Sequence, residues 1–342
     1  MAEKHSRAVI WSQYLAARVV AAGLTSFNVQ ASLRTAHAAG GWLYGRDHRH
    51  RERAKHHLAM AFPEFSDARI EAVGRASFSH LMKLGMEVLH TPRTLHPHTW
   101  SQHLEIGDLG PALELLNARK PAILLTGHLG NWEVLGYVLA LLGYDMAAIA
   151  RPLDNPLINR WLLGIREKRG LEIITKFNAT DRMLYVLRHA GALGFIADQN
   201  AGDKGLFVPY FGWLASTYKS IGLLAMRCRV PIVCGYAHRK SDDFQYEVGV
   251  QDIIRPEDWA SRPDPLYYIT ARYARAIEQM VRRRPEQYLW MHRRWKSRPR
   301  HERAGEAMPG LLREKIEALP WMDEATLRRL QEPVRAAAEV TG

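Results

Sequence analysis

The chain contains 342 residues, a length that accommodates an α/β enzyme domain with helical extensions. Its net charge of +12 is concentrated in residues 1–60, with nine Lys/Arg and three Asp/Glu, and in residues 282–303, with nine and two. Such basic segments suit phosphate-bearing partners, namely anionic lipid headgroups or an acidic carrier protein. Nucleic acid is not expected as a partner, because the chain has no zinc-finger spacing, recognition-helix motif or aromatic RNA-binding signature. For residues 46–57 a solvated helix face is the alternative.

The first predicted helix, residues 8–24, is apolar apart from Ser12, Gln13 and Arg18. A bilayer span needs about 20 predominantly apolar residues, whereas a helix lying in the membrane interface tolerates polar interruptions. The segment therefore favours an in-plane or re-entrant anchor, and we expect residues 1–60 to form a basic, membrane-associating helical part. A buried core helix and a secretory signal peptide interrupted by Arg18 are the alternatives.

A strand-like apolar run at residues 121–126 leads into the most informative turn of the chain. Gly127 and Gly130 free the backbone to turn, and Asn131 can cap a following apolar helix at residues 132–142. The sequence therefore predicts a strand, a tight turn and a helix in succession.

His128 lies in this turn and Glu133 in the first turn of the helix. Because the histidine precedes the helix, we predict that the two side chains meet. An imidazole oriented by a carboxylate is a general base that can remove a proton from an alcohol near neutral pH. A histidine that only caps a buried turn is the alternative. A zinc site is disfavoured because no second histidine follows at helical spacing.

Strand-like and helix-like segments alternate downstream of this turn. We predict strands at residues 146–150, 172–175, 192–197 and 231–236, and helices at residues 156–168, 181–189 and 218–227. Alternation of this kind is typical of βαβ units, so the predicted fold class is α/β, with a mostly parallel central sheet flanked by helices. His128, Arg151 and Asp198 each follow a predicted strand, and we expect them to share the rim at which open sheets bind ligands.

Residues 128–133, His-Leu-Gly-Asn-Trp-Glu, closely resemble the signature block of the lipid A lauroyl/myristoyl acyltransferase family, whose wider membership includes phosphatidylinositol mannoside acyltransferases. Further blocks follow the family's order: Phe62-Pro63-Glu64 and Glu87 upstream, then ARPLDNP at 150–156, ADQN at 197–200, GLFVPYFG at 205–212 and PEQYLWMHRRWK at 285–296. The resemblance extends over about residues 50–300. It implies a glycerolipid-acyltransferase-like domain at residues 61–300 and a C-terminal helical tail at 301–342.

The resemblance also implies a reaction. His128, supported by Glu133, deprotonates a glycolipid hydroxyl, which attacks the carbonyl of a fatty acyl thioester. Backbone amides near Gly130 or Asn131, with Arg151, stabilise the oxyanion. The donor partner is acyl carrier protein or acyl-coenzyme A, a co-substrate, and no cofactor or metal is required. Because no Ser or Cys stands in a nucleophile-elbow motif, direct transfer is more economical than an acyl-enzyme.

Three polar residues are candidates for substrate binding at the rim. The Arg151 guanidinium can hold a phosphate or carrier group through two hydrogen bonds; an ordinary surface salt bridge is the alternative. Asp198 and Gln199 can orient polar parts of either substrate, and capping of a βα turn is the alternative for both.

Three aromatic residues, Phe207, Tyr210 and Phe211, are candidates for lining an acyl-chain channel. Plain core packing is the alternative for all three. Residues 290–296 mix aromatic and cationic side chains, as expected at a membrane interface or on a basic face that covers the sheet.

The expected acceptor is a lipid A precursor, although other glycolipids, such as phosphatidylinositol mannosides, suit the same site. A catalytically silent lipid-binding protein and a thioester hydrolase are the alternatives. Cys228 and Cys234 are the only cysteines and lack the C-x-x-C spacing, which favours the cytosol. Together with the resemblance, this implies a peripheral or monotopic protein on the cytoplasmic face of the bacterial inner membrane, with the anionic membrane surface as a partner.

Overall fold

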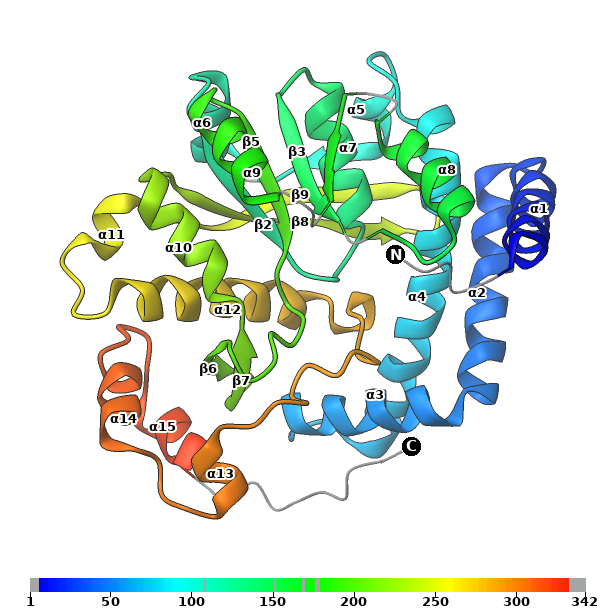
Figure 1. Ribbon diagram of the computed structural model, residues 1–342. Coiled ribbons are helices and arrows are strands. Elements are labelled where there is room, and N and C mark those ends of the chain that lie inside the picture. The colour runs from blue at the N-terminus through cyan, green and yellow to red at the C-terminus, as the bar shows by residue number, and fades with distance from the viewer. Residues whose placement is uncertain (1–5, 108, 151, 168–169, 176–178, 332–342) are drawn as a thin grey trace.

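A seven-stranded sheet with the order β1-β9-β8-β2-β5-β3-β4 forms the centre of the molecule, and a separate hairpin pairs β6 with β7 (Figure 1). This computed structural model describes residues 6–107, 109–150, 152–167, 170–175 and 179–331. Strand β9 runs antiparallel to β8, and the remaining pairs of the central sheet are parallel. The predicted α/β class with a mostly parallel central sheet is therefore confirmed.

The elements occur in chain order as follows: α1 (Arg7–Thr25), α2 (Val29–Arg46), α3 (His48–Ala61), α4 (Asp67–Thr94), α5 (Trp100–His103), β1 (Leu104–Ile106), α6 (Gly110–Asn117), β2 (Ala122–Thr126), α7 (Trp132–Leu141), β3 (Met146–Ala150), α8 (Pro156–Glu167), β4 (Glu172–Thr175), α9 (Ala179–Arg188), β5 (Ala192–Ile196), β6 (Leu206–Tyr210), β7 (Trp213–Thr217), α10 (Lys219–Cys228), β8 (Ile232–Ser241), β9 (Gln245–Ile254), α11 (Pro256–Ala260), α12 (Pro265–Arg283), a 3-10 turn η1 (Pro285–Gln287), α13 (Arg300–Ala304), α14 (Gly310–Glu317) and α15 (Glu324–Gln331).

The predicted strands and helices between residues 121 and 236 all occur, with shifts of a few residues at their ends. Strand β8 is longer than predicted, because it continues to Ser241 and pairs with β9. Strand β9 and the β6–β7 hairpin were not predicted from the sequence. Both pair with antiparallel strands and do not belong to the alternating strand–helix pattern.

Side chains of β2 alternate between the two faces of the sheet, as period-2 geometry requires. Ile123 and Leu125 belong to the main core, which also contains buried residues of α9, α10 and α12. Leu124 packs on the other face, with Ala112 of α6 and Ala140 of α7. The strand that leads to the predicted catalytic turn is therefore covered by helices on both sides.

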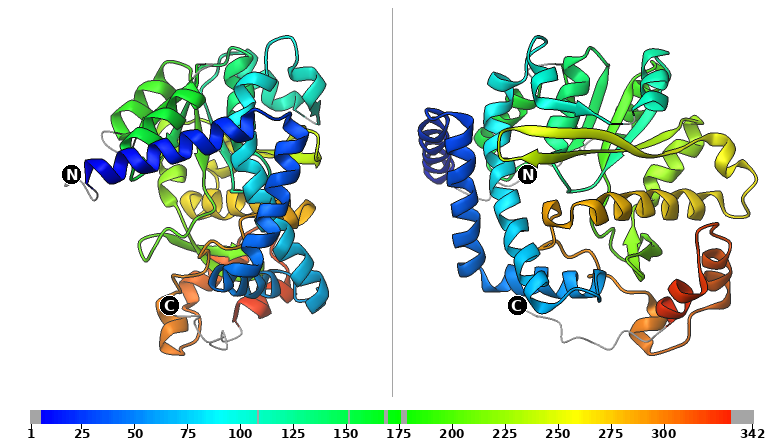
Figure 2. Two further views of the ribbon diagram at one scale, coloured as in Figure 1. Left: turned by 90° about the vertical axis from the view of Figure 1, so that its right-hand side faces the viewer. Right: turned by 180° about the vertical axis from the view of Figure 1, so that it is seen from behind.

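Helices α1 to α4 form a layer beside the sheet, in which α2 and α4 run side by side (Figure 2). A Cβ atom on Gly40 of α2 would lie 2.3 Å from the Ser79 Cα of α4, so only glycine allows this approach. Helix α1 contacts α8, where Asn155 Nδ2 donates to the Ile10 carbonyl oxygen (2.9 Å) and the Arg18 guanidinium lies over the Trp161 ring.

Helix α1 is long and apolar enough to cross a membrane, the one such helix within the described ranges. Only 11% of its most apolar window is buried in the protein. Large apolar side chains of α1, among them Trp11, Leu15 and Val19, are exposed. The helix is therefore not the buried core helix considered as an alternative.

The C-terminal helices α13 to α15 lie against the opposite end of the molecule from α1 (Figure 1). Three buried residues of this part belong to the main core: Ile316 of α14, Leu319 between the helices, and Leu330 of α15. The described part of the predicted tail therefore packs on the enzyme domain.

Candidate active site

A histidine–aspartate pair lies at the carboxyl ends of two neighbouring parallel strands. The register of β2 and β5 places Thr126 beside Ile196, so the segments that follow both strands emerge together. His128 Nδ1 lies 2.7 Å from Asp198 Oδ1, and the His128 backbone N–H donates to Asp198 Oδ2 (2.9 Å). Two contacts from one carboxylate therefore orient the ring and the backbone of the same residue.

The electrostatics of Asp198 determine how His128 is protonated. Burial would raise the pKa of the Asp198 carboxyl, but the His128 imidazole and N–H outweigh burial and lower it to about 2. An ionised carboxylate only accepts hydrogen bonds, so Nδ1 of His128 carries a proton. Nε2 of the neutral ring is then left with its lone pair, as a general base requires.

Glu133 does not orient His128, contrary to the prediction. Its carboxylate binds the Arg166 guanidinium of α8 through two hydrogen bonds, of 2.6 and 2.9 Å. His128 lies before α7 and its Nδ1 points to β5, whereas Glu133 in the first turn of the helix faces α8. Asp198, predicted to orient a substrate, instead takes the position that the prediction gave to Glu133.

Gln199 lies between His128 and a second histidine, His292. The Gln199 amide nitrogen lies 3.3 Å from His128 Nε2 and 2.7 Å from His292 Nε2. The His128 and His292 rings have centroids 5.4 Å apart. His292 was not a predicted site residue; its only signal in the sequence was its place within the block at residues 285–296.

The backbone of the turn is bound to the protein on both sides. Gly130 has φ +54°, and a Cβ atom there would lie 2.1 Å from the Ala237 carbonyl oxygen, so the position requires glycine. Its N–H donates to the Gln287 carbonyl, and the Asn131 N–H donates to that of Ala237. These two amides are therefore engaged, and the prediction that they bind the oxyanion is wrong in this arrangement.

Asn131 caps α7 as predicted, since its side-chain oxygen accepts a hydrogen bond from the Val134 N–H (2.9 Å). Its side-chain nitrogen donates to Glu87 Oε2 (2.8 Å). Asn131 is fully buried, and we therefore assign it to holding the turn rather than to contacting a substrate.

A buried ion pair lies behind the turn. The Arg239 guanidinium of β8 binds both oxygens of Glu87 of α4, each at 2.6 Å, and also contacts His80 Nδ1. His80 Nε2 in turn lies 3.0 Å from the Gly130 carbonyl oxygen. Burial and the Arg239 charge hold the pKa of His80 well below its ordinary value, so His80 is neutral and donates to that carbonyl. The network connects α4 and β8 to the turn that carries His128.

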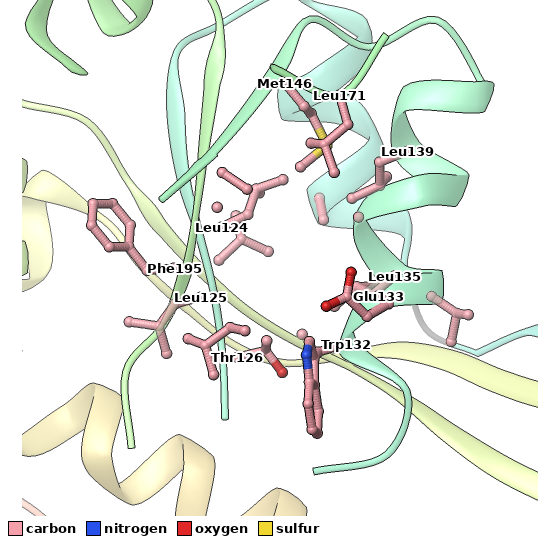
Figure 3. Close-up of a pocket in the computed structure, with 18 of the residues that line it drawn as sticks. Leu124, Leu125, Thr126, Trp132, Glu133, Leu135, Leu139, Met146, Leu171 and Phe195 are labelled. Atoms are coloured by element: carbon pink, nitrogen blue, oxygen red, sulfur yellow. The ribbon is translucent and has the colours of Figure 1, made fainter. Parts of the chain in front are cut away.

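An apolar cavity begins beside His128. It offers a volume of about 150 Å³ between the sheet and helices α6 and α7. Figure 3 shows Thr126, Trp132 and Glu133 near one end and Met146 with Leu171 at the other. The Trp132 and His128 ring centroids are 5.0 Å apart, so the end with the polar groups adjoins the histidine.

The predicted acyl-channel residues lie elsewhere. Phe207, Tyr210 and Phe211 are not among the residues that line this cavity. Tyr210 and Phe211 are fully buried in an aromatic cluster with Trp290, because the β6–β7 hairpin packs against α12. The core-packing alternative is therefore the one that the structure supports.

Arg151 lies outside the described residues, and its predicted role as a phosphate or oxyanion ligand stays a prediction. Thr126, which was not predicted as a site residue, lines the cavity two positions before His128. Its hydroxyl is buried and has no hydrogen-bond partner among the residues that the structure describes.

Comparison with known proteins gives consistent matches. The family model of bacterial lipid A biosynthesis acyltransferases matches residues 3–297. A lipid A biosynthesis acyltransferase 1 of Shigella flexneri is 26% identical over 76% of this chain and 78% of its own length. A lipid A biosynthesis lauroyltransferase of Escherichia coli K12 is 27% identical over 71% of this chain and 78% of its own length. A palmitoleoyltransferase of the same strain is 29% identical over 50% of this chain and 55% of its own length.

Proposed function

The chain belongs to the family of bacterial lipid A biosynthesis acyltransferases, and on that premise we propose that it transfers a fatty acyl chain from a thioester donor to a hydroxyl of a lipid A precursor. Acyl carrier protein or coenzyme A carries the acyl chain in this proposal. The observation that carries it is the His128–Asp198 pair, with a 2.7 Å contact, beside an apolar cavity that Trp132 helps to line.

Proton transfer follows from the state of the pair. His128 Nε2 takes the proton of the acceptor hydroxyl, and ionised Asp198 stabilises the resulting imidazolium. The acceptor oxygen then forms a bond to the thioester carbonyl carbon. When the C–S bond breaks, the thiolate leaves and takes the proton from His128, which restores the neutral ring.

Gln199 controls access to Nε2 in this scheme. Its amide nitrogen can donate to the lone pairs of His128 and His292 at once, at 3.3 and 2.7 Å. The longer contact to His128 is the weaker, so an acceptor hydroxyl displaces Gln199 there while His292 keeps it in place.

The oxyanion needs donors other than Gly130 and Asn131. The Thr126 hydroxyl is the best candidate, because it is buried, lines the cavity and lacks a partner in the described part of the chain. An unpaired buried hydroxyl is costly in the free protein, and a developing negative charge would repay that cost. We propose that Thr126 donates to the carbonyl oxygen of the donor.

The apolar cavity suits the acyl chain. Its described lining is apolar except for Thr126, Glu133 and Arg166. Each methylene transferred from water to such a lining contributes about 0.8 kcal/mol, so binding of acyl methylenes there is favourable when the thioester carbonyl lies next to His128.

Helix α1 supports membrane association. Trp11, Leu15 and Val19 recur every four residues and are 53%, 54% and 71% exposed. An exposed apolar stripe on a helix beside an enzyme domain suits insertion into the membrane interface, which would bring the active site to a lipid acceptor. We propose the cytoplasmic face of the inner membrane as the location.

The test is mass spectrometry of the glycolipids from source cells that lack the gene and are complemented with variants. Wild type is expected to restore one acyl chain to a lipid A precursor, and His128→Ala is expected to restore none. His98→Ala changes an exposed histidine and serves as the matched control.

Normal acylation by a folded His128→Ala protein would disprove the proposed chemistry. Acylation of a different glycolipid would redefine the acceptor. If the purified protein releases free fatty acid at the same rate with and without lipid, it is a hydrolase.

A further inference from the structure

The two basic segments of the sequence meet beside the active site. Arg53 of α3 donates from Nη1 to the Met291 carbonyl oxygen (3.2 Å), across 238 residues of sequence. His57, one turn later, contacts the Trp290 carbonyl oxygen through Nδ1 (2.9 Å). Helix α3 therefore lies along the segment that carries His292 and Arg293.

Two of the four Lys/Arg residues of α3 have an acidic partner, but Arg49 and Arg53 do not. Arg51 pairs with Glu52 and Lys55 with Glu71. For Arg49, Arg53 and Arg293 no ion pair occurs within the described ranges. We call these three residues the arginine cluster.

The members of the arginine cluster repel one another. Burial lowers the pKa of Arg53, and the charges of Arg293 and Arg49 lower it further, against a smaller opposing effect of Asp47. Asp47 is itself engaged with His50 Nδ1, at 2.7 Å. Arg53 Nη2 is buried and has no hydrogen-bond partner in the part of the chain that the structure describes. Like charges and an unpaired donor in one place are unfavourable unless an anion binds.

The arginine cluster is close to the reacting atoms. Met291, which Arg53 contacts, immediately precedes His292, and the ring of His292 lies 5.4 Å from that of His128. The Arg53 charge also contributes to lowering the pKa of His292, although burial is the main cause. An anion bound by the cluster would therefore belong to a molecule whose reactive group can reach His128.

We propose that Arg49, Arg53 and Arg293 form a subsite for a phosphate group of a substrate. The inference rests on the proposed function and names the charged group that the site recognises. Guanidinium groups bind phosphate oxygens through paired hydrogen bonds, which a lone lysine does not provide. The phosphate belongs either to a phosphate ester on the sugar of the acceptor or to the phosphodiester of the pantetheine arm of the donor.

The experiment pairs a double variant with substrates that lack phosphate. The double variant Arg53→Gln/Arg293→Gln and wild type are assayed side by side. The acceptor is a phosphorylated or a dephosphorylated lipid A precursor, and the donor is acylated acyl carrier protein or acyl-pantetheine. The variant is expected to lower kcat/KM by about 10- to 100-fold with the phosphorylated substrate, the effect of losing charge-assisted hydrogen bonds. With the matching dephosphorylated substrate, wild type and variant are expected to be alike.

Which dephosphorylated substrate abolishes the difference identifies the source of the phosphate. Arg300→Gln/Arg303→Gln makes the same charge change in the same basic segment, but on α13, and is expected to behave as wild type. Thermal unfolding of each variant checks that the loss is not a loss of fold. Equal losses with both forms of each substrate, or no loss with any of them, would overturn the proposal.

A binding assay separates this inference from the proposed function. Equilibrium binding of the two precursors to the His128→Ala protein needs no turnover. If the cluster holds a phosphate of the acceptor, the phosphorylated form binds more tightly, and adding Arg53→Gln/Arg293→Gln removes the preference. Absence of turnover in wild type together with this preference would refute the enzyme mechanism but keep the subsite.

Discussion

At the residue scale, the site depends on which carboxylate reaches the histidine. Glu133 and Asp198 were both predicted site residues. Only Asp198 contacts His128, at 2.7 Å. Glu133 instead balances the charge of Arg166 at the cavity. The two acids therefore differ in function although both are part of the site.

Replacing Asp198 by Asn is expected to lower kcat by about 10³- to 10⁴-fold, the magnitude seen when the acid of a Ser-His-Asp triad is replaced. Asparagine can hold the wrong tautomer, with Nε2 protonated, so the base is lost. Steady-state kinetics on the folded variant measure the effect. Because the pKa of Asp198 is held at about 2, wild type is expected to show no titration of this carboxyl above about pH 4.

Glu133→Gln is the matched comparison. It removes the partner of Arg166 without touching His128, so we expect KM to change while the acidic limb of the kcat/KM profile keeps its midpoint. A shift of that midpoint in Glu133→Gln, with none in Asp198→Asn, would restore Glu133 as the orienting acid.

At the scale of elements, the β2–α7 turn is positioned by α4 and β8 rather than by its own residues alone. Glu87 and Arg239 are both buried. Their network contacts the Gly130 carbonyl oxygen through His80, and Glu87 accepts a hydrogen bond from Asn131. A long helix and a strand far apart in sequence therefore hold the turn that carries His128.

Arg239→Met is expected to lower the free energy of unfolding by about 3–5 kcal/mol, because it leaves the Glu87 carboxylate buried without its cation. Urea denaturation followed by circular dichroism measures this. Arg182→Met breaks an exposed pair of the same two-bond geometry with Glu172 and should leave the midpoint nearly unchanged. Similar midpoints for both variants would show that the buried pair adds nothing to stability.

Helix α1 is the element that the membrane proposal depends on. Leu15→Asp/Val19→Asp places two charges on the exposed stripe and is expected to reduce binding to anionic vesicles at least about tenfold. Co-sedimentation with vesicles measures the bound fraction. Leu311→Asp alters an exposed leucine of α14, 66% accessible, and should not reduce binding. Equal losses in the two variants would remove the special role of α1.

At the scale of the whole molecule, buried neutral histidines link stability to pH. Burial lowers the pKa of His57 to about 4 and that of His238 to about 3. The unfolded chain binds protons at these positions near pH 6.5, whereas the folded protein does not. Stability therefore rises with pH between the folded and unfolded pKa values and is lost as the pH falls below about 6.5.

The free energy of unfolding is expected to be about 1–2 kcal/mol lower at pH 5 than at pH 7 for each such histidine. His238→Gln removes one titrating group, so its pH 5 to pH 7 difference should be smaller than that of wild type by about this amount. Urea denaturation at the two pH values, rather than absolute stability, is the measurement. An unchanged difference would show that His238 is protonated in the folded state.

Local sequence signals were enough to predict the strand, the glycine turn and the capped helix around His128. These depend on local signals: an apolar run, glycines where the backbone turns, and Asn131 capping the next helix. Local signals also predicted the alternating elements that follow, because each is specified within about ten residues.

Three features became visible only in the folded protein. They are the partner of His128, the hydrogen bonds of the turn amides to backbone carbonyls, and the arginine cluster. Asp198 lies 70 residues beyond His128, and the register of β2 with β5 brings the two together. Glu133 is the nearer acid in sequence, but its position on the first turn of α7 directs its side chain to Arg166 of α8. Pairing across a sheet and packing between helices depend on contacts between residues far apart in the chain, and local sequence patterns do not predict such contacts.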